Sequence, residues 1–484
     1  MNLATFAIQN RVFTLTLTVL MIVGGLQTFQ GLSRLEDPEF TIKDALVITP
    51  YPGASATEVA EEVTDELEIA VQQLGQLDEV SSKSDRGLST LTVTIKEQYG
   101  KEDLPQIWDE LRRKVSDAQI NLPPGAGPSI VVDDYGDVYG VFVAVYGSEY
   151  SYAELKKYVD LLKRELLLVD DVAKIATYGE RKESIYVELS RDRMAQLGFS
   201  VAAIASELQQ KNEVVDAGRV RVGREFIAIE PSGSSTTIEQ LEGILLRGGD
   251  QQIYLRDVAT VRRGYVDPPD HLIRFDGNAA IGLGISTVSG GNVVAMGKAL
   301  RKRMDELRTQ TPLGIEFGIV SLQSKAVEMA ISSFVLSLAQ AVAIVIAVLL
   351  LFMGVRSGLL IGFILVLTIS GTFIIMAPMG VALERISLGA LIIALGMLVD
   401  NAIVVVDGML IRLGRGEKPE EAAAKVVSQT SIPLLGATVI AVLAFAAIGT
   451  SDDATGEFCR SLFQVVLASL MLSWLTAVTV TPLL

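Results

Sequence analysis

The sequence predicts a multi-pass membrane protein: a bundle of six α-helical transmembrane spans that carries a large α+β region outside the bilayer. Half of the residues are hydrophobic, and they gather in six charge-poor runs. Each run is long enough to cross a bilayer, which takes about 20 apolar residues. The charged residues gather instead in one long stretch between the first run and the second. Within that stretch, helix-start signals alternate with short segments typical of β-strands.

Each span is expected in a long segment without charged residues. The fourth such segment is interrupted by Asp400 and Asp407. The first span follows a single basic residue, Arg11, and no small-x-small cleavage site comes after it. It is therefore interpreted as an uncleaved membrane anchor and not as a signal peptide. The six runs are Val12–Ser33, Met329–Val355, Ser357–Leu383, Ile386–Ile411, Val426–Ser451 and Ser461–Leu484.

Basic residues in the short loops set the orientation, because short cytoplasmic loops carry an excess of lysine and arginine. The long stretch after the first span gives no such signal, since long segments are translocated largely regardless of charge. Six basic residues fall on one side of the bilayer and two on the other, so the large region is expected on the outer side of the membrane, which is the periplasm if the cell is Gram-negative. The six are Arg11, Arg356, Arg412, Arg415, Lys418 and Lys425, and the two are Arg385 and Arg460.

The outer region is predicted to contain two α+β units of the ferredoxin-like, split βαβ type. In the first, the capping box "SATE" (Ser55–Glu58) starts a helix between the strand-like segments "ALVIT" and "STLTVTI". In the second, "SYAE" (Ser151–Glu154) starts a helix after "VYGVFVAVYG". Residues 180–268, with a Gly/Arg-rich hairpin at 214–230, interrupt this unit, which resumes with a helix at Val293–Leu307. One large α+β domain is the alternative.

Composition excludes several classes of function. The net charge of −16 argues against a nucleic-acid partner, and no G-x-x-x-x-G-K-[ST] motif is present to hold ATP phosphates. The single histidine, His271, rules out a His-based metal cluster, and the single cysteine, Cys459, rules out an intrachain disulfide. No cofactor and no metal site are expected, and the chain is not expected to be an enzyme.

A carboxylate stands within the fourth span, in the stretch "LGMLVDNAIVVVDG". A charged Asp at the bilayer centre costs about 2.5–3.5 kcal/mol on insertion scales, so a functional role is the default hypothesis. On a helix, Gly389, Gly396, Asp400 and Asp407 share one stripe within about 40°, where glycines let a second helix approach closely. Asn401 lies about 100° round from Asp400, where its amide can donate or accept beside the stripe.

We interpret Asp400 as a proton carrier. A carboxyl group that alternates between a dry surrounding and one with a nearby cation binds and releases a proton, and no nucleotide motif offers another energy source. No lysine or arginine lies inside any of the six runs, so the cation is expected from outside this chain, which then represents half of a larger machine or a fragment of one. The alternative is that Asp400 only fixes helix packing. That alternative is stronger for Asp407, which lies near the cytoplasmic interface.

This order of elements resembles the N-terminal half of resistance–nodulation–division (RND) exporters, the proton-driven pumps of Gram-negative inner membranes. The stretch "LGMLVDNAIVVVDG" carries the likeness most specifically, and "YPGAS", "LEDPEF" and "LRDVATV" support it. The resemblance implies twelve spans in two pseudo-repeated halves, with the lysine that pairs with the acid in the other half. It also implies a homotrimer in the lipid bilayer of the inner membrane, which works with a periplasmic adaptor (membrane fusion) protein and an outer-membrane channel as a tripartite pump.

The same resemblance divides the chain into parts. Residues 1–34 hold the first span and residues 325–484 hold the other five. Residues 35–134 form porter subdomain 1, residues 135–179 and 269–324 form porter subdomain 2, and residues 180–268 form a docking-type insertion.

The resemblance also assigns roles to residues. Asp400 matches the first aspartate of the usual fourth-span pair, and Asn401 stands where drug exporters have the second. With Asp407, these residues form the expected proton relay. Some heavy-metal exporters also carry a single aspartate here. Tyr139 and Tyr178 fall where drug-exporting members place the aromatic residues of the deep pocket, which would stack on flat apolar ligands. Strand packing is the alternative role for both tyrosines.

The predicted function is proton-motive-force-driven efflux of amphiphilic organic compounds such as drugs, dyes and detergents, by proton antiport. Export of metal ions is an alternative, although the twelve methionines form no cluster with histidine or cysteine. Export of lipids or envelope components is a second alternative. A non-transporting membrane scaffold is the third.

Overall fold

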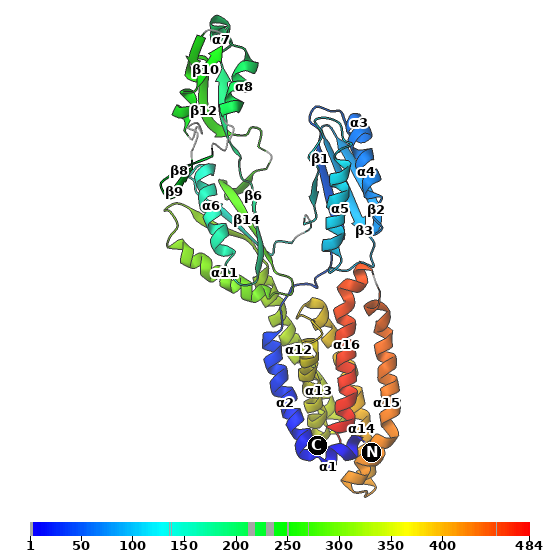
Figure 1. Ribbon diagram of the computed structural model, residues 1–484. Helices are drawn as coiled ribbons and strands as arrows, with labels where there is room; N and C mark the ends of the chain where they lie inside the picture. The colour runs from blue at the N-terminus through cyan, green and yellow to red at the C-terminus, as the bar shows by residue number, and fades with distance from the viewer. Residues whose placement is uncertain are drawn as a thin grey trace.

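The computed structural model describes residues 3–134, 136, 138–211, 218–228, 237–248, 251–269, 271–451 and 453–484. A bundle of long helices forms the lower part of Figure 1, and two lobes of strands and helices stand on one end of it. The second lobe is extended at its far end by a further small unit. Of the predicted hairpin at 214–230, residues 214–217 and 229–230 lie outside the described residues.

Six helices in the described chain are long and apolar enough to cross a membrane, in agreement with the six predicted spans. Their ends differ from the charge-free runs, because a helix ends where the backbone conformation changes and not where a charge appears. For example, α12 ends before Gly354, whose φ of +82° breaks the helix. The six are α2 (Arg11–Gly31), α12 (Gln323–Met353), α13 (Val355–Met376), α14 (Arg385–Gly414), α15 (Pro419–Gly449) and α16 (Ala454–Thr479). A short helix, α1 (Leu3–Gln9), precedes them and was not predicted from the sequence.

The helix with the intramembrane acid, α14, is held from several sides. It contacts α12, α13, α15 and α16, and α16 in turn contacts α13 and α15. Buried aliphatic side chains fill the contact between α14 and its neighbours, among them Leu391 and Leu398 of α14 and Val465 and Leu470 of α16. Movement of α14 therefore requires repacking against α16, since close-packed interiors do not deform continuously.

Close approach of α2 to α13 depends on Gly25, because a Cβ at this position would lie 2.2 Å from the carbonyl oxygen of Ser370. We expect Gly25→Ala to lower the free energy of unfolding by about 1–3 kcal/mol, since backbone cannot yield as a flexible side chain does. Thermal melting of the detergent-solubilised protein measures this effect. Gly31→Ala is the control on the same helix, because no atom lies within 4 Å of its added Cβ. Equal melting temperatures for the two variants would contradict the prediction.

The first lobe, subdomain 1 (residues 44–132), is a four-stranded antiparallel sheet in the order β2-β3-β1-β4. The predicted capping box is present: the Ser55 hydroxyl accepts from the Glu58 amide, and the Glu58 carboxylate accepts from the Ser55 amide. Leu67 and Leu111 of the helices are buried against Leu91 of the sheet. The elements are β1 (Asp44–Pro50), α3 (Ala56–Val59), the π-helical turn η1 (Ala60–Thr64), α4 (Asp65–Val71), β2 (Leu77–Asp85), β3 (Leu88–Ile95), α5 (Leu104–Ala118) and β4 (Ile130–Val132).

The second lobe, subdomain 2 (residues 141–178 and 273–322), repeats this plan, since its strands run in the order β6-β14-β5-β15 and β13 adds to β14. The predicted capping box at Ser151 and Glu154 starts its first helix. The buried faces of both helices, with Leu155 and Leu300, cover the sheet at Leu283. The elements are β5 (Val141–Tyr146), α6 (Tyr152–Leu166), β6 (Val172–Tyr178), β13 (Ile273–Phe275), β14 (Asn278–Thr287), α11 (Val293–Arg308) and β15 (Glu316–Leu322).

Between β6 and β13 the chain forms a separate small unit with its own core, which includes Ile204, Leu246 and Leu255. Its first and last strands, β7 and β12, pair with each other and lead back to subdomain 2. The described part of the predicted hairpin forms two paired strands, β8 and β9. The elements are β7 (Glu183–Leu189), α7 (Arg191–Leu197), α8 (Val201–Lys211), β8 (Arg219–Val222), β9 (Glu225–Ala228), α9 (Ile238–Glu242), β10 (Leu245–Gly248), β11 (Gln251–Tyr254), α10 (Leu255–Val258) and β12 (Ala259–Tyr265).

Candidate functional site

Asp400 lies on the face of α14 that the described chain leaves uncovered. Its side chain is exposed, as is that of Asp407, while the opposite face, with Leu398 and Ala402, is buried. Gly389 and Gly396 belong to the same uncovered stripe, because no atom lies within 4 Å of a Cβ built on either of them. A helix could thus pack closely over the acid, as glycine stripes in membranes allow.

Asn401 points away from this stripe, into the contact between three helices. Its side-chain nitrogen donates to the Thr438 hydroxyl of α15 at 3.4 Å and to the Ser473 hydroxyl of α16 at 3.3 Å. Ser473 donates its own proton to the carbonyl oxygen of Leu398 at 2.6 Å, so it offers position 401 only an acceptor. The Thr438 hydroxyl also donates to the Asn401 side-chain oxygen at 3.5 Å. An amide therefore uses both its oxygen and its nitrogen here, whereas a carboxylate could accept from Thr438 but could not donate to Ser473. This contact is a physical reason for an amide and not a carboxylate at position 401.

The two helix positions that contact Asn401 were missed by the sequence analysis. The sequence does contain a signal for Ser473. This residue belongs to a set of hydroxyl side chains that recur at helical spacing and are all buried: Ser469, Ser473 and Thr476. Thr438 has no comparable pattern around it. Its role follows only from the approach of α15 to α14.

Neither acid of the stripe has a cationic partner within the described residues. The nearest basic residue along the helix, Arg412, instead pairs with Glu417 at 3.2 Å and donates to Gln429 at 2.8 Å. Asp407 is therefore not neutralised by Arg412, although both lie in the C-terminal part of α14. A cation that approaches Asp400 would have to come from a segment that covers the exposed stripe.

A further carboxyl group, Glu384, lies buried at the N-terminal end of α14, with 4% of its surface exposed. Burial raises its pKa from the usual 4.5 to about 7, with further increases from the charges of Asp37 and Glu39, while the Ser461 hydroxyl opposes the shift. The segment that holds Asp37 and Glu39 folds over this end of the bundle, and a cavity beside it is lined by Glu39, Glu384 and Ser461. Glu384 was not among the predicted site residues.

This shift predicts a pH-dependent stability. The folded-state pKa lies above the unfolded value, so the folded protein holds the proton more tightly, and the free energy of unfolding falls as pH rises from 4.5 towards 7. We expect Glu384→Gln to remove this loss and to stabilise the protein above neutral pH by on the order of 2–3 kcal/mol. Melting temperatures at acid and alkaline pH measure it, with the exposed Glu420→Gln as control. An unchanged pH slope in Glu384→Gln would contradict the prediction.

The two tyrosines assigned to a ligand pocket lie together against the sheet of subdomain 2, with Tyr178 at the end of β6 and Tyr139 just before β5. The ring centroids of Tyr139 and Tyr178 are 5.8 Å apart in an edge-to-face arrangement, and the ring of Phe142 lies 5.8 Å from that of Tyr178. Glycines on β14 make room for these rings, since a Cβ on Gly282 would lie 2.4 Å from the Phe142 ring and one on Gly284 would lie 3.0 Å from the Tyr139 ring. We call Tyr139, Phe142 and Tyr178 the aromatic cluster. Phe142 was not among the predicted residues, although it lies in the quoted segment "VYGVFVAVYG".

A cavity of about 410 Å³ lies beside the cluster and is lined by Tyr178, Arg181, His271 and Ile273, among others. Tyr178 is 40% exposed, so part of its side chain is available to a ligand. An aromatic ring with apolar neighbours suits flat apolar compounds. Among the described residues no group of three or more His, Cys, Asp or Glu side chains is placed to hold a metal ion.

The apolar helices, the α/β units outside the bundle and the acid within a span together define a multi-pass membrane transport protein. The model of the AcrB/AcrD/AcrF family matches residues 3–484. The chain therefore belongs to this family of RND multidrug pumps, as the sequence motifs predicted.

Individual relatives match at low identity over the whole chain. An uncharacterized transporter of Haemophilus influenzae is 24% identical over 489 residues, which cover 100% of this chain and 47% of that protein. Multidrug resistance protein MdtF of Escherichia coli K12 is 24% identical over 498 residues, with coverage of 100% and 47%. Multidrug export protein AcrF of the same strain is 25% identical over 505 residues, with coverage of 100% and 48%. The chain thus spans about half the length of these relatives.

Proposed function

We propose that the whole protein exports amphiphilic organic compounds such as drugs, dyes and detergents, and that a proton gradient drives the export. The observation that carries the proposal is Asp400, an acid in an apolar helix, on a glycine-lined stripe that nothing in the described chain covers. The names of the relatives MdtF and AcrF, which refer to multidrug resistance and multidrug export, support drugs over other cargo.

In this mechanism Asp400 binds a proton from one side of the bilayer and releases it to the other. A cation on a helix that packs over the stripe favours release, since a nearby positive charge stabilises the carboxylate. Asn401 takes part by holding α14 against α15 and α16 through Thr438 and Ser473. Asp407, on the same stripe, is the second proton-relay group, towards the cytoplasmic end.

For substrates, the aromatic cluster forms the binding surface. Aromatic rings in offset or edge-to-face contact with a flat ligand contribute about 0.5–1.5 kcal/mol per pair beyond the area buried. The charged residues around the adjoining cavity, such as Arg181 and Glu180, suit the polar ends of amphiphilic compounds. Substrate enters from the periplasm or the outer leaflet of the inner membrane.

The proposed assembly is a homotrimer in the inner membrane with a periplasmic adaptor and an outer-membrane channel. Subdomains 1 and 2, each with strand order like that of a ferredoxin-like split βαβ unit, are the porter subdomains, with boundaries at 35–134 and at 135–179 plus 269–324. The insertion 180–268 is the docking part. Residues 1–34 and 325–484 provide the spans.

The test uses the full-length protein in proteoliposomes with an imposed ΔpH and a fluorescent dye as substrate. Dye movement that requires the gradient, and that a protonophore abolishes, is the expected result. Gradient-independent or absent transport would refute the proposal. A pump-deficient host that expresses the protein separates the alternatives: resistance to dyes and detergents is expected, whereas resistance to copper or silver alone would favour metal export.

A further inference from the structure

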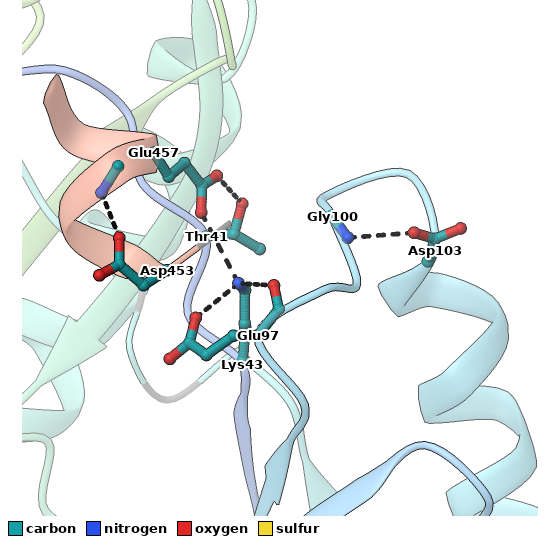
Figure 2. A network of polar contacts seen from close by, with 8 residues as sticks. Thr41, Lys43, Glu97, Gly100, Asp103, Asp453 and Glu457 are labelled. Carbon is teal, nitrogen blue, oxygen red and sulfur yellow. Dashed lines mark hydrogen bonds and ion pairs between the residues drawn. The ribbon is translucent and has the colours of Figure 1, made fainter. Parts of the chain in front are cut away.

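Lys43 lies at the junction between subdomain 1 and the membrane bundle, and its side chain is only 8% exposed. Its ammonium donates to the carboxylate of Glu97 at 2.8 Å and to the Glu97 carbonyl oxygen at 2.5 Å, both within subdomain 1. It also lies 4.0 Å from the carboxylate of Glu457, which belongs to the first turn of α16. Figure 2 shows this single ammonium between the two carboxylates.

Glu457 is tied to the same segment by its other oxygen, which accepts from the Thr41 hydroxyl at 2.5 Å. The turn that carries Glu457 is itself fixed, because Asp453 caps α16 by accepting from the Gly456 amide at 2.6 Å (Figure 2). Next to these polar contacts, the rings of Phe40 and Phe458 lie 6.5 Å apart, edge to face. Both apolar and charged contacts therefore join residues 40–43 to the start of α16.

The far part of α16 reaches the intramembrane site. Ser473, about 24 Å along the helix axis from Glu457 at 1.5 Å per residue, bonds Asn401 and the carbonyl oxygen of Leu398 on α14. A packed helix moves as a rigid element. A displacement of α14 around Asp400 would therefore shift α16, and with it the Glu457 carboxylate.

We propose that Lys43 is a positioning residue that couples the proton site to subdomain 1, by linking the rigid core of this lobe through Glu97 to α16 through Glu457. The inference rests on the proposed function, since it assigns the path by which proton binding moves the porter part. Another link between the segment before β1 and the bundle, the ion pair of Glu36 with Arg385 at 2.6 Å, is exposed on the Arg385 side and joins a different helix. Of these two links, only the one through Lys43 has a buried basic side chain.

Burial makes the Lys43 contact sensitive to the loss of either carboxylate, because a buried charge that loses its partner is left uncompensated. The two partners have different roles in the proposal. Glu97 holds Lys43 within subdomain 1, whereas Glu457 makes the ion pair that connects it to α16. The N-cap carboxylate of α16, Asp453, adds a weaker electrostatic contact with Lys43. Removal of the Glu97 carboxylate therefore tests the stability of subdomain 1, and removal of the Glu457 carboxylate tests the coupling between subdomain 1 and the bundle.

The experiment measures gradient-driven dye transport, proton flux without substrate and melting temperature for the full-length protein in proteoliposomes. Glu457→Gln and Lys43→Met are expected to lower dye transport about tenfold while proton flux persists, and the double variant falls no further because both changes break the same link. Lys43→Arg, which keeps the charge, restores transport. Glu97→Gln is expected to lower the melting temperature clearly and to lower dye transport only slightly. Lys96→Met, which removes an ammonium bonded to the Gly75 carbonyl, leaves all three quantities unchanged.

The outcomes separate this inference from the proposed function. If unmodified protein shows no gradient-driven transport, the proposed function fails and the inference fails with it. If unmodified protein transports dye and Glu457→Gln does so equally well, the inference alone is refuted. A proportional loss of transport, proton flux and melting temperature in Lys43→Met and Glu457→Gln, without rescue by Lys43→Arg, would also refute it, because that pattern indicates a structural role only.

Discussion

Asp400→Asn is expected to abolish gradient-driven export while expression and membrane insertion stay normal. The substitution keeps the size of the side chain and removes the group that carries the proton. One charge moved across 100 mV is worth about 2.3 kcal/mol, which corresponds to about a 50-fold accumulation ratio for a substrate exchanged with one proton. Without a carrier this accumulation disappears, and dye distribution across the vesicle membrane equalises.

The comparison variant is Asp407→Asn, because both acids lie on the same exposed stripe of the same helix and the proposal gives Asp407 the secondary relay role. If Asp400 is the mid-membrane carrier, Asp407→Asn retains substantial transport, with a changed rate of release at the cytoplasmic side. Export by Asp400→Asn at the level of unmodified protein would refute the proton-carrier role. Loss of the protein from the membrane in Asp400→Asn would instead point to helix packing, and its folded fraction in detergent distinguishes the two.

Tyr178→Ala is expected to lower export of flat aromatic dyes by about tenfold, which corresponds to roughly 1.4 kcal/mol of lost binding. The ring of Tyr178 contacts those of both Tyr139 and Phe142, so its removal disrupts the whole aromatic cluster. Tyr178→Phe keeps the ring and should retain export. The concentration dependence of dye transport checks this, with the larger effect on apparent affinity and not on maximal rate.

Tyr254→Ala serves as the matched control, because Tyr254 is 43% exposed and Tyr178 is 40% exposed. Tyr254 lies in the small unit between β6 and β13, where it stacks with Arg256, away from the cluster. Equal losses of dye export in the two alanine variants would show that any exposed tyrosine of the outer region has this effect. Resistance that is lost for dyes but kept for detergents would further indicate stacking as the interaction.

The spans and the starts of the helices outside the bundle were predictable because their signals are local. A run without charge has few alternatives to a span, and the capping boxes at Ser55 and Ser151 mark helix starts through contacts within four residues. The ends of the spans were less predictable. α12 begins at Gln323 because β15 ends just before it, and α16 ends at Thr479 well before the last apolar residue.

The site was only partly predictable, and Asn401 shows why. Helical periodicity placed it beside the stripe, but its partners belong to α15 and α16, which lie far along the chain. Glu384 shows the same limit, with its partners earlier in the chain. Its burial depends on the segment with Asp37 and Glu39, which folds back over the end of α14, and no pattern around Glu384 indicates this.

By itself the sequence determined the six spans, the acid on a glycine stripe and the two capped α+β units, because periodicity, charge and capping act within a few residues. Only the tertiary structure decided which hydroxyl groups meet Asn401, which rings surround Tyr178 and which carboxylates share Lys43. These contacts join residues up to hundreds of positions apart, and their geometry depends on how helices and sheets pack. That packing is set by the summed burial of many apolar side chains and not by any local pattern.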